Sequence, residues 1–245
     1  MTFFFRKHKK KLLGALSILL LIVLLFCANA LTIFVLPTQT IANAIESNTF
    51  EVFLISLAKS QVKNESISRA EDFQKIGAGG FVWEYEDYYH VVSSAYLNKS
   101  DALLVQNSIK LNQNIDSQLL TITFDSIKLN GNFDEQEYKV VSNLLFSPIN
   151  FYTCLYDIAV SLDTKVFDQT NAKLAVNTAQ HTFSTTLANF NTLYPKPHPD
   201  DLSLIYNICL EAYSTGEKLC REEKISDEQN YSSLLKYRYL EVLNI

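Results

Sequence analysis

A long apolar run near the N-terminus constrains this chain more than any other feature. Residues 12–36 form 25 predominantly apolar positions without a charged side chain. At about 1.5 Å of rise per residue, a helix of that length spans the roughly 30 Å hydrocarbon core of a bilayer with some tilt. The sequence therefore predicts a transmembrane helix at residues 12–36.

The charges beside this segment predict its orientation. Five basic residues lie between Arg6 and Lys11, and the first 36 residues contain no acidic residue. By the positive-inside rule, residues 1–11 stay in the cytoplasm and the chain after the helix is translocated. Residues 28–30 have the Ala-x-Ala form of a signal-peptidase site, but the apolar run continues past them. We therefore expect an uncleaved anchor in a single-pass cell-membrane protein with extracytoplasmic C-terminal domains.

Composition excludes two broad classes of protein. The 209 residues after position 36 contain 16 basic and 26 acidic residues, a net charge of −10. A nucleic-acid-binding surface needs a basic patch that displaces phosphate counterions, and this acidic region indicates none. An apolar content of 48%, with 12% aromatic residues, excludes a wholly disordered chain. Residues 37–48 are polar, show no sustained period and are predicted to be a linker.

Residues 49–130 have the pattern of a small α+β domain. Alternating or short β-branched runs predict strands, and apolar residues at spacings of three and four predict helices. The predicted order is strand, helix, strand, strand, helix, strand, at residues 51–58, 64–77, 81–85, 88–96, about 98–111 and 118–124. This is the order of the ferredoxin-like fold, in which two helices cover one face of a four-stranded antiparallel sheet. The other face would be free to bind a ligand.

Local signals support the boundaries of these elements. Asn64 is a candidate N-cap for the first helix, and Asn98 or Ser100 for the second. Gly77 stands where a left-handed residue ends a helix, and Glu86-Asp87 is placed as a hairpin turn. The residues expected to face the core from the two helices are Ile67, Ala70, Phe73 and Ile76, and Ala102, Val105 and Ile109.

From Asp134 onward the apolar spacing becomes helical. Asp134 and Glu137 fit a capping box, and the stripe that follows continues to Leu162. Pro148 lies in its path, where a kink or a split is expected. A second stripe consists of Ala172, Val176, Ala179, Phe183, Leu187 and Phe190.

Two further amphipathic segments follow a proline-rich loop at residues 195–199. They begin near Asp200 and Ser226 and carry apolar residues at helical spacing. Four amphipathic helices with short connections favour an antiparallel bundle. Residues 131–245 are therefore predicted to form a four-helix bundle.

The segment from Val52 to Phe124 resembles the sporulation-related repeat (SPOR) domain family. The matching stretches are Val52–Ala58, Ala70, Gly77–Val82, Tyr89–Tyr96 and Ser100–Ala102. The Gly-Ala-Gly turn before an aromatic-Val-aromatic strand is similar to that of divergent members in membrane-anchored proteins of low-GC Gram-positive bacteria. The resemblance implies a cell-envelope protein whose exposed sheet face binds septal glycan strands of peptidoglycan. The first strand lacks the Gln and Gly that the family often has, so the scaffold could persist without glycan binding.

Strand alternation selects the residues on the sheet face that would bind glycan. We expect Trp83, His90, Ser94, Tyr96, Thr121 and Thr123 there, with Glu84 as the alternative to Trp83 because the phase of that strand is ambiguous. Sugar rings stack on aromatic faces, and their hydroxyls need polar partners nearby. In the alternative interpretation, Phe81 and Trp83 are core residues and the neighbouring tyrosines are surface residues of a strand.

The sequence contains no pattern of a catalytic or metal site. Residues 77–80 lack the Lys-Ser/Thr of a phosphate loop, and no G-x-S-x-G pattern occurs. No two of the four histidines share a metal-ligand spacing, and no cofactor is expected. Cys154, Cys209 and Cys220 are interpreted as buried free thiols, although translocation would permit Cys154 to pair with either of the others. We therefore do not expect an enzyme.

Two functional hypotheses stand ahead of a third, a wall-modifying enzyme, which would need a carboxylate or metal cluster in a pocket. The first is a non-catalytic, membrane-anchored envelope protein whose SPOR-like module binds peptidoglycan glycan or a division or sporulation partner. The second is a protein–protein interaction scaffold that acts through the helical bundle, with its sheet face covered and no glycan binding. Helices packed on the open face of the sheet would favour the second hypothesis.

The predicted topology can be tested with a protease added to intact protoplasts. Because the anchor leaves residues 37–245 outside the cytoplasm, we expect the protease to remove them while a cytoplasmic marker protein survives. Immunoblotting against the C-terminal region provides the measurement. A C-terminal region that stays intact until the membrane is dissolved would contradict the envelope assignment.

Overall fold

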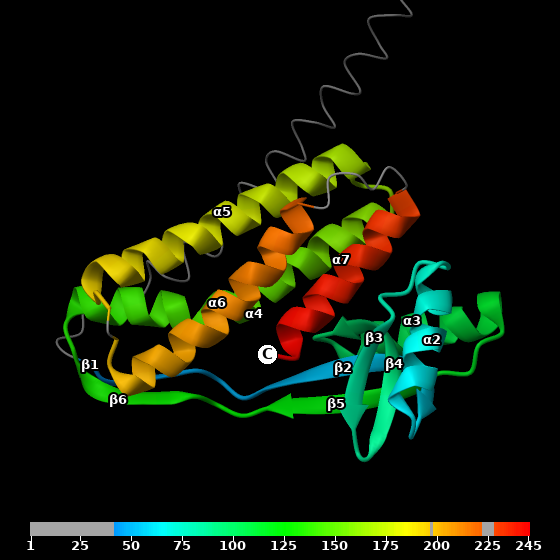
Figure 1. Cartoon of the computed structure of the whole chain (residues 1–245), viewed down its shortest axis with the longest axis horizontal. Helices are drawn as coiled ribbons and strands as arrows, with labels where there is room; N and C mark the ends of the chain where they lie inside the picture. The colour runs from blue at the N-terminus through cyan, green and yellow to red at the C-terminus, as the bar shows by residue number, and fades with distance from the viewer. Residues whose placement is uncertain (1–41, 197, 222–227) are drawn as a thin grey trace, which may run out of the picture. The chain divides into compact units, whose positions relative to one another are not determined.

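The computed structural model of this chain describes residues 42–196, 198–221 and 228–245 (Figure 1). The predicted cytoplasmic segment 1–11, the predicted transmembrane helix 12–36 and the first part of the predicted linker lie outside these residues, as does Ser226. The described part is a mixed α+β structure with six helices and two antiparallel sheets. None of these six helices is long and apolar enough to cross a membrane.

A four-stranded antiparallel sheet forms the first half of the described chain. The strands of this sheet and the two helices between them are, in chain order, β2 (Phe50–Ser60), α2 (Lys63–Gln74), β3 (Phe81–Tyr85), β4 (Tyr88–Tyr96), α3 (Lys99–Gln113) and β5 (Gln118–Phe124). This is the order of strands and helices that the sequence predicts, and the strands lie in the sheet as β3-β4-β2-β5. The predicted hairpin turn is confirmed, because Glu86 and Asp87 both have positive φ, 48° and 63°, as a type I′ turn requires.

The observed α2 differs from the predicted helix in its cap and in its buried face. It follows Val62, so Asn64 lies inside the helix and is not its N-cap. Its buried residues are Ser66 and Ala70, whereas Ile67 is 40% exposed. Ser66 faces the sheet, where its hydroxyl donates a 2.8 Å hydrogen bond to the carbonyl of Tyr89. A buried serine gives no apolar signal, and for this reason apolar spacing selected Ile67 instead.

The glycine run after α2 allows a close approach of three elements. Gly77 has a φ of 92°, and its N–H donates to the carbonyl of Gln74 at 3.0 Å, as predicted for the end of a helix. A Cβ atom on Gly79 would lie 2.9 Å from the carbonyl oxygen of Ser93 and 3.1 Å from the backbone of Lys236 in α7. Glycine at position 79 therefore lets the turn fit between β4 and α7 (Glu228–Leu243).

A second, two-stranded sheet corrects two predicted boundaries. β1 (Ala42–Glu46) lies in the predicted linker 37–48, and β6 (Lys128–Phe133) straddles the predicted domain boundary at residue 130. Between the sheets, the N–H of Ser47 donates to the carbonyl of Ile127 at 2.9 Å. β1 and β6 thus extend the pairing of β2 with β5 towards the long helices. Each contributes too few apolar residues for a period to be visible in the sequence.

Four helices follow β6: α4 (Glu135–Asp163), α5 (Gln169–Leu193), α6 (Asp200–Arg221) and α7. The predicted capping box is present, with the Asp134 side chain accepting from the N–H of Glu137 and the Glu137 side chain from that of Asp134. All six residues of the predicted stripe in α5 are buried. α4 contacts α5, α6 and α7, and its buried face is therefore wider than a single stripe.

Pro148 lies inside α4, which continues through it without the split that was one of the expected outcomes. Proline has no N–H, so the carbonyl of Leu144, four residues earlier, loses its helical donor. Two side chains replace that donor: the Ser147 hydroxyl at 2.8 Å and the thiol of Cys209 in α6 at 3.2 Å. Cys209 is a buried free thiol, and burial raises its pKa to about 12, so it stays protonated and can donate. The proline in α4 is thus matched by a cysteine in α6.

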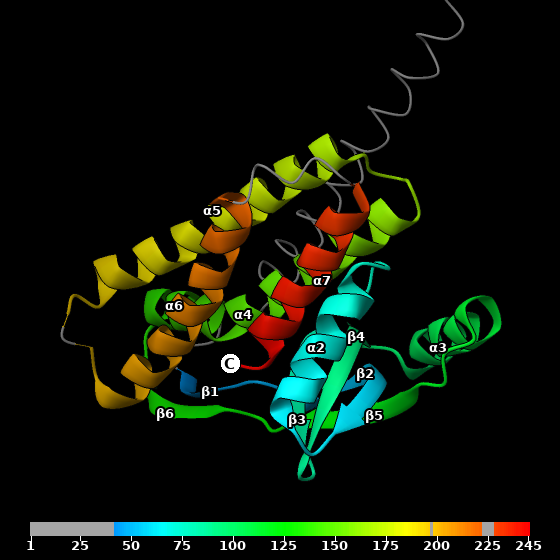
Figure 2. The ribbon, with the colours of Figure 1, turned by 45° about the vertical axis from the view of Figure 1, so that its right-hand side comes forward.

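Both faces of the four-stranded sheet are covered, which contradicts the prediction of a free face. On one face, α2 and α3 pack over Phe53, Ile55 and Leu57 of β2. On the other face, Val52 and Leu54 belong to the core shared with the long helices. Figure 2 shows α2 in front of β3 and β4, and α3 to one side of it. The helical region supplies the second layer over the sheet, a long-range contact that periodicity does not encode.

Gly216 of α6 lies where three helices approach closely. A Cβ atom there would overlap Oε1 of Gln180 in α5 and lie 2.5 Å from Cζ of Phe151 in α4. We expect Gly216→Ala to lower the free energy of unfolding by about 1–3 kcal/mol, because the added methyl group must displace both side chains. The expected loss opposes the gain of about 1 kcal/mol that alanine brings in an exposed helix.

Urea unfolding followed by circular dichroism measures this effect. Ser214→Ala is the matched control, since Ser214 is exposed in the same turn of α6. The control should be as stable as the wild type or slightly more so. Equal stability of the two variants would show that close packing does not require the glycine.

Candidate functional site

The six residues predicted to bind glycan do not share one face of the sheet. The register of β2 and β4 shifts so that Ser93 is an extra residue in β4. On one side of this bulge, Ser94 and Tyr96 lie on the face covered by α2 and α3. On the other side, His90 lies opposite Trp83, on the face covered by the long helices. Simple alternation placed His90 and Tyr96 together because it assumed an unbroken strand.

Four of the six residues are also buried. Trp83, His90, Ser94 and Tyr96 are each less than 9% exposed, whereas Thr121 and Thr123 are exposed on β5. Trp83 and Phe81 pack in the shared core, with the Phe81 ring 5.3 Å from that of Tyr237 in α7. The interpretation of these two aromatic residues as core is therefore confirmed.

The structure brings together one serine–histidine pair that the sequence did not indicate. Oγ of Ser56 lies 3.0 Å from Nδ1 of His90, and it also donates to the carbonyl of Ala58 at 3.1 Å. With its one proton directed to that carbonyl, the hydroxyl accepts from Nδ1–H of His90 and does not donate to it. Both side chains are 3% exposed, and burial lowers the pKa of His90, with the charge of Lys59 adding to the effect. This pair stabilises the irregular strand and is no nucleophile open to a substrate.

A pocket of about 690 Å³ lies between α3 and the C-terminal end of α4. Leu104, Val105 and Ser108 line it from α3, and Tyr156 and Val160 line it from α4. Leu104 is 69% exposed and Val160 39%, so the walls present apolar surface to solvent. A volume of this size lies within the range of about 300–1,000 Å³ that is typical of small-ligand sites.

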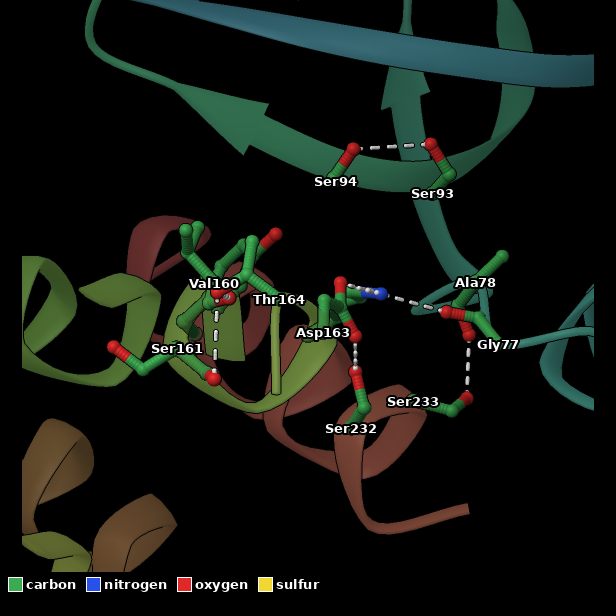
Figure 3. Close-up of polar contacts among 12 residues, drawn as sticks. Gly77, Ala78, Ser93, Ser94, Val160, Ser161, Asp163, Thr164, Ser232 and Ser233 are labelled. Carbon is green, nitrogen blue, oxygen red and sulfur yellow. Dashed lines mark hydrogen bonds and ion pairs between the residues drawn. The ribbon is translucent and has the colours of Figure 1, made fainter. Parts of the chain in front are cut away.

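Hydrogen-bonding groups gather at one end of this pocket (Figure 3). Nζ of Lys236 lies 2.6 Å from Oδ2 of Asp163 and donates to the carbonyl of Gly77 at 2.9 Å. The Ser232 hydroxyl donates to Asp163, and that of Ser233 donates to the carbonyl of Ala78. These contacts join the turn after α2, the end of α4 and the start of α7. The hydroxyl oxygens of Ser93 and Ser94, which are 3.2 Å from each other, lie on the opposite side of the pocket from these contacts.

Two tyrosines close the adjacent edge of β4. β3 pairs only with residues 88–92 of β4, so Ala95 has no strand neighbour on that side. The hydroxyl of Tyr152 in α4 donates to the Ala95 carbonyl at 3.2 Å, and the Ala95 N–H donates to the hydroxyl of Tyr239 in α7 at 3.4 Å. Both tyrosines are at most 1% exposed, and burial raises their pKa values well above the ordinary range. The phenols therefore remain protonated, as the bond to the carbonyl requires.

The pocket itself holds two further tyrosines in contact. The rings of Tyr96 and Tyr156 meet edge to face at 5.7 Å. Burial raises the pKa of Tyr156 to about 12 and also raises that of Tyr96, to which the carboxylates of Asp163 and Asp101 add. Neutral phenols beside carboxylates can donate hydrogen bonds and offer ring faces, but they supply no base or nucleophile at neutral pH. The arrangement is suited to binding.

Sequence reasoning found part of this pocket and missed the rest. It named Ser94 and Tyr96, for the wrong face of the sheet. It placed Tyr156 and Lys236 in predicted helices without a role, and it did not single out Asp163. Lys236 gave no signal of its own, because a single lysine in a predicted helix is usually exposed to solvent. Only the meeting of α7 with the turn after α2 shows what this lysine binds.

The part of the chain that the structure describes contains no metal-ligand cluster and no disulfide. No three His, Cys, Asp or Glu side chains there come together as metal ligands. Cys154, Cys209 and Cys220 are free, and burial raises the pKa of Cys154 to about 11. Low thiolate content makes these thiols poor nucleophiles at neutral pH.

We expect Lys236→Met to lower the free energy of unfolding by about 1–3 kcal/mol. The substitution keeps the length of the side chain but leaves Asp163 and the Gly77 carbonyl without this donor at a partly buried position. Lys218→Met is the control, because the pair of Lys218 with Glu241 is 50% exposed on the lysine side and should contribute no more than about 1 kcal/mol. Urea unfolding of the two variants gives the comparison, and equal losses would contradict a special role for Lys236.

Comparison of the chain with protein-family models, with curated proteins and with solved structures finds no match.

Proposed function

We propose that this chain is a membrane-anchored, non-catalytic interaction protein of the cell envelope, which binds a partner protein in the pocket between α3 and α4. The pocket carries the proposal: its walls expose Leu104 and Val160, and one end is rich in hydrogen-bonding groups. Exposed apolar surface with a polar rim is typical of protein interaction sites. Residues 12–36 would hold the protein in the membrane, and nucleic acid is no partner of its acidic surface.

We also infer the architecture of the two halves of the fold. Residues 50–124 are a SPOR-like module of ferredoxin-like topology, and residues 135–243 are an antiparallel bundle. The strand order β3-β4-β2-β5, with two helices on one face, supports the first assignment. Contacts between helices that follow one another in the chain support the second.

The walls of the pocket favour an amphipathic helix as the bound segment. Asp101, Leu104, Val105 and Ser108 recur along α3 at spacings of three and four, and Tyr156 and Val160 do so along α4. An apolar helix face with residues at the same spacing fits between two such walls. A division or sporulation protein of the same membrane would supply this segment.

One observation favours a second candidate, binding of peptidoglycan glycan in the same pocket. Ser94 and Tyr96, two of the six residues predicted for glycan, line it together with Tyr156 and Asp101. A tyrosine ring face and nearby hydroxyl and carboxylate groups are what a sugar needs. The glycan would then enter from the side of α3 and would not lie on the covered sheet face.

Site-specific photo-crosslinking in living cells tests the proposal. A benzophenone amino acid at position 104, inside the pocket, should give a discrete adduct with another envelope protein. The same amino acid at Leu111, which is 83% exposed on the same helix but lies outside the pocket, should not. Ser108→Trp, which fills the pocket from an exposed position on α3, should reduce the adduct at least tenfold.

Sedimentation of the detergent-solubilised full-length protein with purified sacculi separates the two candidates. If the pocket binds a partner protein and not glycan, the protein should stay in the supernatant. Sedimentation that Ser108→Trp abolishes and Asn107→Trp, on the exposed side of α3, leaves intact would favour glycan instead. Adducts of equal strength from positions 104 and 111 would overturn the pocket as the binding site for a partner protein.

A further inference from the structure

The strand β5 is an edge of the four-stranded sheet that nothing in the described chain covers. β5 pairs with β2 on one side only, and β5 is the last strand in the sheet order. Within the described residues, no backbone hydrogen bond outside that pairing involves residues 118–124. The outer N–H and C=O groups of this strand are therefore a template for another strand.

The sequence of β5 lacks the features that normally protect an edge. Its seven residues, QLLTITF, contain no charged residue, no proline and no glycine, and four of them are β-branched or aromatic. The opposite edge, β3, is shorter, carries Glu84 and has Phe81 packed against Tyr237 of α7. Natural proteins usually blunt free edges with lysine, proline or a bulge. The outer edge of β5 is therefore open to pairing with another strand.

The net charge of the protein opposes self-association except along neutral stretches of its surface. The 209 residues after position 36 have a net charge of −10, so two copies of this protein repel each other over most of their surface. β5 is a seven-residue stretch without charge, bounded by Asp116 and Asp125. A contact between two copies meets least repulsion along such a stretch.

The residues of β5 complement a second copy of themselves. We propose that the protein forms a two-fold symmetric dimer in which β5 pairs antiparallel with β5 of the other copy, centred on Thr121. This register pairs all seven residues of the strand. Thr121 then faces Thr121 of the second copy, and Leu120 faces Ile122, both favourable cross-strand pairs. A two-fold axis generates such an isologous contact, and the result is one continuous eight-stranded sheet.

The same register offsets the flanking carboxylates by one residue, so that they point to opposite faces of the sheet. Asp116 falls opposite Ser126 of the second copy, and Asp125 falls opposite Ser117, so no like charges face each other. Thr121 and Thr123 are both exposed on β5, which leaves the centre of the contact open to a second strand. The dimer does not depend on the pocket between α3 and α4.

Cysteine crosslinking of the full chain in its membrane tests the dimer and its register. Facing residues of an antiparallel pair have Cα atoms about 4.5–5.5 Å apart, within the range of a disulfide. Thr121→Cys should therefore give a disulfide-linked homodimer with a mild oxidant. Thr123→Cys is the matched control, because two copies of position 123 would lie about 14 Å apart at about 3.4 Å per residue. The wild type, with its own four cysteines, gives the background.

A charge substitution provides the second measurement. Thr121→Glu places two carboxylates opposite each other and should weaken dimerisation at least tenfold in sedimentation equilibrium of the detergent-solubilised protein. Thr182→Glu, at an exposed position of α5, should leave the dimer unchanged. A monomeric wild type, equal crosslinking at positions 121 and 123, or an adduct of Thr121→Cys with a different protein would each overturn the proposal.

Discussion

The described fold depends on two hydrogen bonds at Ala95, whose carbonyl accepts from the Tyr152 hydroxyl and whose N–H donates to the Tyr239 hydroxyl. β3 is too short to pair with the end of β4, so the backbone groups of Ala95 that point away from β2 would be buried without a partner. An unsatisfied buried peptide group costs about 1–3 kcal/mol. The two hydroxyls, one from α4 and one from α7, satisfy both its N–H and its C=O. The sheet and the long helices can therefore share one core at this edge.

The pocket follows from the same arrangement. α7 and the end of α4 are held against β4, while α3 buries only Ala102 completely against the other face of the sheet. The space between α3 and α4 keeps apolar walls, and the ion pair of Lys236 with Asp163 holds one end together. A sheet with both faces covered offers no flat surface to a glycan strand, but the helices that cover it form the pocket between α3 and α4. For this reason we favour a partner segment over a glycan strand as its ligand.

Prediction from sequence succeeded where the determinants are local. The order of elements from β2 to β5, the hairpin turn at Glu86-Asp87, the capping box at Asp134 and the buried stripe of α5 all depend on neighbours within a few residues. It failed for the buried face of α2, where a serine takes an apolar position because a carbonyl lies opposite. It also failed for the candidate site, since the bulge at Ser93 moves His90 and Tyr96 to opposite faces.

The sequence alone determined the α+β composition, the positions of most strands and helices, the acidic character of the region after residue 36 and the expectation of a membrane anchor. These properties are set by local periodicity, capping and charge, which do not depend on tertiary contacts. Tertiary structure alone decided that the helices cover the sheet, that β1 and β6 pair and that the pocket lies beside α3. Those features come from contacts between residues up to 159 positions apart, such as Lys236 with Gly77. A pattern along the chain holds no information about which distant groups will meet.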